Sequence, residues 1–152
     1  MDKTNKDILR LLQEDANLPV GEIAQRVGLS TTPCWRRIQQ LEQSGVIARR
    51  VTLLDPAKIN VGVTVFMSIK ASEHSEAWFH AFASVVASIP QIVDFYRMSG
   101  DTDYLMRVVV PDIAAFDGVY KRIVRDVKLS DISSSFAMEQ IKYTTSLPLD
   151  YA

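Results

Sequence analysis

The hydrophobic residues of this chain change their spacing near Asn60, and this change divides the fold into two successive parts. Before Asn60 the apolar side chains recur every three or four positions, which places them on one face of a helix. After it, β-branched runs alternate with longer amphipathic segments, which predicts strands alternating with helices. Asp55-Pro56 at the junction favours a turn, because the residue before a proline avoids the helical region. The expected bounds are a first domain at 1–54, a linker at 55–60 and a second domain at 61–152.

Three short helices are predicted in the first part. Gly28 is placed to end the second helix in a left-handed conformation. Ser30 is a good N-cap for the third helix, and Pro33 falls in its first turn, where a missing N–H costs nothing. The third helix is expected to run to about Ser44, and a strand is expected over 46–54. This order predicts a winged helix-turn-helix, a common DNA-binding motif.

The second part predicts an α+β domain of βαββαβ order, the ferredoxin-like arrangement with both helices on one face of the sheet. The expected strands are 61–71, 92–99, 103–110 and 132–143, and the expected helices are 75–89 and 111–127. The first strand is apolar on both alternations, with Val65 and Met67 on one and Phe66 on the other. A sheet covered on one face only does not need this, so a second copy of the chain is the simplest cover for the open face.

The formal charge gives no general argument for nucleic-acid binding, since 17 Lys and Arg oppose 18 Asp and Glu. Residues 1–60, however, carry nine basic and seven acidic side chains, and the remainder carries eight and eleven. The first part is therefore slightly positive and the second negative. With so little excess charge per subunit, useful affinity for DNA has to come from several DNA-binding units held together.

Composition excludes several other classes. Hydrophobic residues at 47% and charged residues at 23% are typical of a folded globular protein, and no apolar run reaches the roughly 18 residues of a membrane span. The charged N-terminus has no signal-peptide core, and the single cysteine excludes an internal disulfide and a cysteine zinc framework. We therefore expect a cytoplasmic protein, and a nucleoid-associated one if the first part binds DNA. Cys34 is either a thiol sensor or, by far the better interpretation, a buried small hydrophobe.

The third helix has the chemistry of a DNA reader on one side. Cys34, Ile38 and Leu41 share the side that packs inward. Arginine on the other side pairs with guanine or phosphate, glutamine with adenine, and hydroxyls with phosphate. Trp35 either stacks on the DNA or packs in the core, and the competing interpretation of the whole set is a merely solvated face. The candidate DNA contacts are Ser30, Thr31, Thr32, Pro33, Trp35, Arg36, Arg37, Gln39, Arg49 and Arg50.

An acidic turn, Gly100 to Tyr104, joins the two halves of the second domain. It is a hairpin turn, a weak metal site without histidine support, or a site for a free amino acid. An amino acid needs a carboxylate for its ammonium group and N–H or hydroxyl donors for its carboxylate, and Ser133 to Ser135 add hydroxyls. No catalytic triad, phosphate loop or zinc spacing is present, so we expect no catalytic residue, metal or cofactor. Asp94, Arg97 and Arg107 lie on predicted strands, where we expect no role for them beyond cross-strand ion pairs.

Short stretches spread over nearly the whole chain resemble one known family. Those of the first part are Asp7-Ile8-Leu9, Glu22-Ile23-Ala24, Val27-Gly28-Leu29-Ser30, Thr32-Pro33-Cys34, Arg37, Leu41-Glu42 and Gly45-Val46-Ile47. Those of the second are Leu54-Asp55-Pro56, Ser99-Gly100-Asp101-Thr102-Asp103-Tyr104-Leu105 and Met138-Glu139-Gln140-Ile141-Lys142. In one register, they resemble the Lrp/AsnC (feast/famine) transcription regulators, in which a winged helix precedes a ligand-sensing (RAM-type) domain.

The resemblance implies a dimer that assembles further, commonly into octamers, and binds double-stranded DNA. It also implies a free amino acid bound between dimers, by the acidic turn and the last strand. The implied effector residues are Met98, Ser99, Gly100, Asp101, Asp103, Tyr104, Ser134, Ser135 and Phe136. The chain departs from the family pattern at Asn5, Asn17 and Arg50, and residues 124–129 lack the usual Pro-Gly.

The first hypothesis is therefore a sequence-specific DNA-binding regulator controlled by an amino acid, with no membrane partner. The second is an architectural DNA-bending protein without ligand control. The third is a small ferredoxin-like enzyme with an accessory helical domain.

Overall fold

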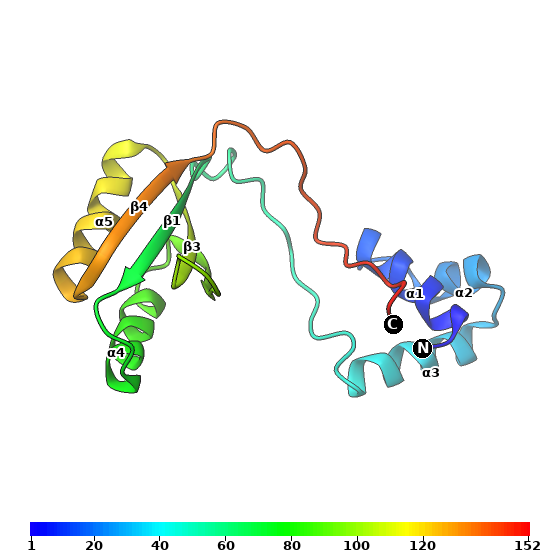
Figure 1. The fold of residues 1–152 in the computed structure, drawn as a ribbon. Coiled ribbons are helices and arrows are strands. Elements are labelled where there is room, and N and C mark those ends of the chain that lie inside the picture. Colours follow the sequence, from blue (N-terminus) through cyan, green and yellow to red (C-terminus); the bar gives the residue numbers. More distant parts are fainter. The chain divides into compact units, whose positions relative to one another are not determined.

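The computed structural model describes residues 1–152, and they form two compact units (Figure 1). Unit 1 comprises Met1–Leu53 together with Ile141–Ala152, and unit 2 comprises Leu54–Gln140. The end of the chain, expected in the second domain, thus belongs with the first. The reason is that Leu149 packs against the apolar core of unit 1, a contact that sequence spacing does not encode.

Unit 1 is built from three helices around one core. They are α1 (Lys3–Glu14), α2 (Val20–Val27) and α3 (Thr31–Gln43). The core side chains are Ile8, Leu9, Ile23, Ala24, Cys34, Ile38 and Leu41, all buried. Each lies at the helical spacing expected for an inward face, so the helix periodicity read from the sequence is confirmed.

A left-handed glycine makes the turn between α2 and α3. Gly28 has φ of 72° and is the C-cap of α2. The amide of the next residue, Leu29, donates to the carbonyl of Ala24 at 2.9 Å, which closes the helix end. Ser30 then takes the N-cap position of α3 in an extended conformation. The short turn fixes the direction in which α3 leaves α2.

The strand expected over 46–54 is absent, and that prediction is wrong. The amide of Ile47 still donates to the carbonyl of Leu41 at 3.0 Å, but no backbone hydrogen bond involves Ala48–Leu54. A strand exists only as a member of a hydrogen-bonded ladder, and unit 1 holds no other strand with which this segment could pair.

Unit 2 is a four-stranded antiparallel sheet with two helices. Its elements are β1 (Val63–Ala71), α4 (Glu76–Ala87), β2 (Ile92–Arg97), β3 (Tyr104–Val110), α5 (Ile113–Asp126) and β4 (Leu129–Phe136). The strand order is β2-β3-β1-β4, and α4 and α5 both cover one face (Figure 1). The predicted ferredoxin-like order is confirmed. No helix of the chain combines the length and the apolar character needed to cross a membrane.

The last strand ends earlier than the sequence pattern indicates. We expected residues 132–143, whereas β4 is Leu129–Phe136. The amide of Ala137 makes a last bond to the carbonyl of Thr64 at 2.9 Å, and β1 begins one residue earlier, at Val63. The strand expected from the sequence continues beyond this point, but its partner strand β1 does not.

The sheet has one buried and one open face. Val65, Met67 and Ile69 of β1 are fully buried beneath α4 and α5, whereas Phe66 remains 41% exposed on the opposite face. Burying one such apolar side chain contributes about 1.5–3 kcal/mol to stability. The open face also carries the ion pair between Asp94 Oδ2 and Arg107 Nε at 2.5 Å, which confirms the cross-strand pairing expected for these two residues.

Candidate functional site

The outward side of α3 is the first part of the site. Cys34, Ile38 and Leu41 hold the helix against α1 and α2, so the opposite side faces solvent. Trp35 is 49% exposed there, which excludes the alternative that it packs in the core. Arg36 is exposed beside it, and Gln39 is half-buried. The helix thus presents an aromatic ring, a guanidinium group and an amide to whatever binds this side.

The beginning of α3 leaves polar groups free. The side chain of Ser30 makes no capping hydrogen bond, although the residue holds the N-cap position. The first N–H groups of a helix have no partner within it, and the residues that carry the first two here, Thr31 and Thr32, are exposed. Pro33 has no N–H to leave unsatisfied. Free amides and hydroxyls at a helix N-terminus are good donors to a phosphate.

Two of the four candidate arginines are free and two are not. Arg36 and Arg49 are exposed and form no ion pair. Arg37 Nη1 instead donates to Asp2 Oδ2 at 2.5 Å and to Asn5 Oδ1 at 2.9 Å. Arg37 therefore ties α3 to the beginning of α1. One of its two partners, Asn5, is a position where the chain departs from the family pattern.

Arg50 is also occupied within unit 1. Its Nη2 donates to Glu42 Oε1 and its Nη1 to the carbonyl of Ala16, both at 3.0 Å. These bonds hold the segment after α3 against the end of that helix.

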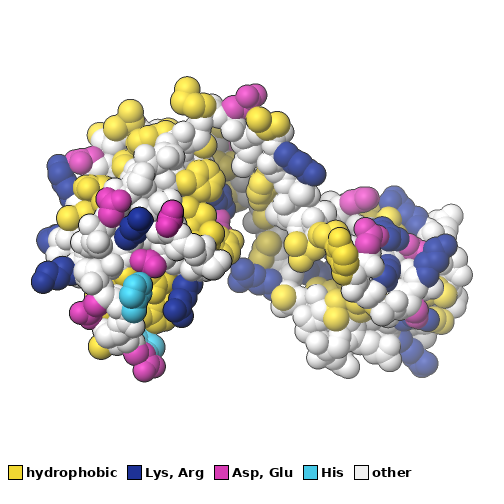
Figure 2. Space-filling view, in the orientation of Figure 1, with side chains coloured by type: hydrophobic (Ala, Val, Ile, Leu, Met, Phe, Trp, Pro, Cys, Tyr) yellow, Lys and Arg dark blue, Asp and Glu magenta, His cyan; other side chains and the backbone are white.

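Basic and acidic side chains are interspersed on the face shown in Figure 2, without a continuous basic stripe. Arg36 and Arg49 are thus the candidate arginines whose guanidinium groups are available without breaking a contact.

Cys34 is fully buried in the core of unit 1. Burial raises the pKa of its thiol, and the nearby charge of Arg37 opposes this only in part. A buried thiol with a raised pKa is a poor nucleophile, since the thiolate is the reactive form. The interpretation of Cys34 as a small hydrophobe fits this environment.

The acidic turn between β2 and β3 is the second part of the site. The amide of Met98 donates to the carbonyl of Asp103 at 2.8 Å, which closes the turn. Gly100 has φ of 106°, a conformation that other residues rarely adopt. Asp103 Oδ2 accepts a bond from the amide of Ala71 at 2.8 Å. The Asp103 carboxylate is thus already engaged with the end of β1, whereas Asp101 is exposed.

Tyr104 serves the core of unit 2. It is 5% exposed and packs among Trp78, Phe82 and Phe95, with ring centroids 5.4–5.9 Å away. Met98 and Ser99, by contrast, are exposed at the turn. No group of three or more His, Cys, Asp or Glu side chains is arranged to hold a metal ion.

The turn and the last strand do not meet within one chain. Strand β4 lies at one edge of the sheet and β2 at the other, with β3 and β1 between them. Ser134 and Ser135 pair with Met67 and Phe66 in the middle of β1, and the turn adjoins the same strand two residues from Met67, at Ile69. Phe136 packs its ring on Phe116 at 5.2 Å. Within one chain, strand β1 therefore lies between the acidic turn and the serines of β4.

Comparison with known proteins decides the family. Residues 64–147 match the model of the Lrp/AsnC ligand binding domain, and residues 1–48 match a winged helix-turn-helix DNA-binding model. The chain belongs to the Lrp/AsnC family. It is a DNA-binding transcriptional regulator that carries a ligand-binding domain.

Relatives of this Lrp/AsnC regulator match over nearly their whole length. The DNA-binding transcriptional activator DecR of Escherichia coli (strain K12) is 50% identical over 151 residues, 99% of each chain. The glutamate uptake regulatory protein of Zymomonas mobilis is 47% identical over 149 residues, 98% of this chain and 91% of that protein. These relatives are regulators, which confirms that the chain is not an enzyme.

Solved structures agree with the fold. An AsnC family transcriptional regulator from Agrobacterium tumefaciens is 62% identical and superposes with a TM-score of 0.96, covering 99% of both chains. The complex of transcriptional regulator NMB0573 with L-Met, from Neisseria meningitidis, is 35% identical with a TM-score of 0.94, covering 99% of this chain and 98% of that one.

Sequence reasoning missed the residues that hold α3 in place. Asp2 and Asn5 lie more than 30 positions before Arg37, at separations of 35 and 32. Neither belongs to a recognisable motif with Arg37. The local signal at Asp2 is its position as N-cap of α1, where Oδ1 accepts from the amide of Asn5 at 2.7 Å.

Proposed function

We propose that this chain regulates transcription by reading DNA with the outward face of α3, under the control of a free amino acid. The observation that carries the DNA-reading role is the contrast between Arg36 and Arg37. Arg37 is bonded to Asp2 and Asn5 and so holds α3 to α1, whereas Arg36 is exposed and unpaired beside Trp35 and Gln39. A fixed helix with a free guanidinium and amide on one side is suited to base edges in the major groove.

The amino-acid effector is supported by chemistry and by relatives. Asp101 is an exposed carboxylate that suits an ammonium group, and Ser99 supplies a hydroxyl beside it. A relative from Neisseria meningitidis is a complex with L-Met, and one from Zymomonas mobilis regulates glutamate uptake. The turn and Ser134 to Phe136 lie apart in one chain, so we place the effector between subunits of two dimers.

The assembly follows from the open face of the sheet. Phe66 and Tyr96, exposed by 41% and 56%, lie on this face beside the half-buried pair of Asp94 and Arg107. A second copy that packs on this face buries the apolar rings, and further association, up to an octamer, brings turns and last strands together. An effector that fits one assembly better than another changes the spacing of the α3 helices on DNA.

The DNA-reading role is tested with Arg36→Ala and a duplex from the region upstream of the protein's own gene. We expect the variant to lose about 1–3 kcal/mol of specific affinity, the usual worth of a side chain that reads a base. Arg122→Ala removes the same charge from α5 and is the matched control. Affinity is measured by fluorescence anisotropy at fixed salt, against a scrambled duplex. Equal affinities of wild type and Arg36→Ala for the specific duplex would overturn the assignment of α3.

The effector is tested by a thermal-shift screen of the twenty common amino acids, including L-methionine and L-glutamate. A ligand at 100 times its Kd adds about 2.7 kcal/mol to stability. Asp101→Asn should remove the shift, whereas Asp117→Asn on α5 should not. A flat screen together with normal DNA binding would favour the second function, an architectural protein that bends DNA without ligand control.

A further inference from the structure

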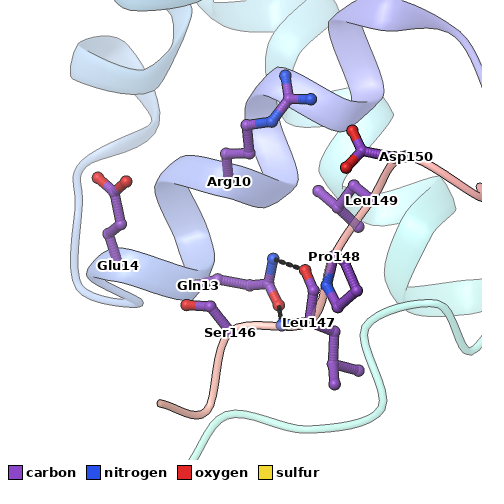
Figure 3. A pocket seen from close by; sticks show the side chains of 8 residues that line it. All are labelled: Arg10, Gln13, Glu14, Ser146, Leu147, Pro148, Leu149 and Asp150. Carbon is purple, nitrogen blue, oxygen red and sulfur yellow. Dashed lines mark hydrogen bonds between the residues drawn. The ribbon is translucent and has the colours of Figure 1, made fainter. Parts of the chain in front are cut away.

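The end of the chain docks on α1 through one glutamine. Gln13 Oε1 accepts a bond from the amide of Leu147 at 2.7 Å, and Gln13 Nε2 donates to the carbonyl of the same residue at 3.3 Å (Figure 3). A single side chain thus satisfies both backbone groups of a residue 134 positions away. This paired geometry resembles strand pairing and fixes the orientation of the docked segment.

Apolar packing reinforces the docking. Leu149, two positions after Leu147, packs against the core that holds α1, α2 and α3 together. The segment Ser146–Asp150 and α1 together line a cavity of about 210 Å³, shown in Figure 3. The contact therefore has a polar pair and an apolar anchor, the combination that gives a docked segment one defined register.

The docked segment is connected to α3 through α1. The last turn of α1 holds the segment through Gln13, and the beginning of α1 holds Arg37 of α3 through Asn5 and the N-cap Asp2. Leu9, in the middle of α1, packs in the same core as Ile38 of α3. Whatever displaces the docked segment therefore acts on the helix that positions α3.

The same segment continues from the strand where we place the effector. β4 ends at Phe136, and the chain rejoins unit 1 at Ile141. Between the end of β4 and the docking site at Leu147, residues Met138–Thr145 make no backbone–backbone hydrogen bond. The segment is therefore held at its two ends. The chain thus passes between the two units twice, once before β1 and once after β4.

We propose that docking of residues 141–152 on α1 is required for full DNA affinity, and that this docked tail is the connection through which β4 acts on the DNA-binding unit. This inference rests on the proposed function, because it names a regulator of the same α3 surface. A docked tail keeps α1 in the arrangement that presents α3, and an undocked tail lowers the population of that arrangement.

The test measures DNA affinity of full-length variants by fluorescence anisotropy on the promoter duplex. Gln13→Met keeps the length of the side chain and removes both bonds to Leu147. We expect it to weaken binding about fivefold, the factor that corresponds to the net loss of roughly 1 kcal/mol of hydrogen bonding. A chain that ends at Gln140 should lose at least as much. Gln13→Glu keeps the acceptor and loses the donor, and should be intermediate.

Two controls keep the result specific. Gln25→Met changes an exposed glutamine of α2 whose side chain makes no hydrogen bond, and a chain that ends at Leu149 keeps both docking residues, Leu147 and Leu149. Both variants should bind as wild type does. Circular dichroism at the assay temperature shows that each variant is folded. Hydrogen exchange of Gln13→Met should rise in residues 144–149 and in the last turn of α1, with unit 2 unchanged.

The outcomes separate the two proposals. If the wild type does not prefer the promoter duplex, the proposed function fails. If it does, and Gln13→Met and the chain ending at Gln140 bind equally well while hydrogen exchange reports an undocked tail, the inference alone is overturned. Unchanged exchange in Gln13→Met would also overturn it, since Gln13 would then not hold the tail.

Discussion

Neighbouring residues of identical chemistry have different roles in this chain, and their partners decide which. Arg36 and Arg37 are adjacent on α3, yet the first is unpaired and the second is bonded to Asp2 and Asn5. Sequence reasoning assigned both to DNA because it recognises the type of side chain on a helix face. The partner of Arg37 comes from another helix, and no local pattern marks it.

Substitution should separate these two arginines. Arg37→Ala is expected to destabilise unit 1 by about 1–3 kcal/mol, because it removes hydrogen bonds to a charged group. Arg36→Ala should leave stability within about 0.5 kcal/mol, since exposed side chains without partners contribute little. Urea unfolding followed by circular dichroism measures both. Equal destabilisation by the two variants would contradict the assignment of Arg37 as a structural tie.

The pH dependence of stability should report on Asp2. The amide of Asn5 and the guanidinium of Arg37 lower the pKa of the Asp2 carboxyl below its ordinary value. A lowered pKa in the folded state means that the stabilisation is complete above the ordinary value of about 3.9 and is lost as the pH falls through the folded pKa. Asp2→Asn should therefore be less stable than wild type at pH 7, with a smaller difference at pH 2.5. Glu14→Gln, an exposed change on the same helix without an ion pair, should show no such convergence.

Single glycines determine where elements end. Gly28 takes φ of 72° and its missing Cβ would meet no atom within 4 Å, so only backbone strain opposes a side chain there. Gly28→Ala should cost about 1–2 kcal/mol for a left-handed alanine. Gly21→Ala, within α2 and equally open, should be neutral or stabilise by about 0.5–1 kcal/mol. Thermal unfolding measures both, and a loss at Gly21 as large as that at Gly28 would contradict the left-handed turn.

Most elements were predictable from the sequence, and the two errors share one cause. The helices and the strand order follow from local periodicity, N-caps and glycines, all of which act within a few residues. Residues 46–54 and 137–143 are expected as strand from the sequence but have no strand beside them. Whether a segment becomes a strand depends on a partner that the segment itself does not specify.

At the scale of the molecule, the open face of the sheet should control self-association. Phe66→Glu places a charge where we expect a second copy to pack, so the variant should sediment as a smaller species than wild type. Ile113→Glu changes a residue that is 70% exposed at the beginning of α5 and is the matched control. An unchanged assembly in Phe66→Glu would place the dimer interface elsewhere.

The candidate site was predicted in its parts and not in its arrangement. The outward face of α3, the glycine turn and the acidic turn could be found because each is a local pattern. That Asp103 is bonded to Ala71, that Tyr104 is buried, and that β1 lies between the turn and Ser134 follow from strand order and register. Register joins residues from separate strands, and the sequence of one strand does not contain it.

The sequence by itself determined the family, the two successive folds and the helix that we propose reads DNA, because periodicity, caps and short motifs are properties of neighbouring residues. Only the tertiary structure decided which arginines are free, which carboxylate of the turn is available, and that the end of the chain belongs to the DNA-binding unit. The bonds of Gln13 to Leu147 span 134 positions. Contacts at such separations form only after the helices have packed, so no local pattern records them.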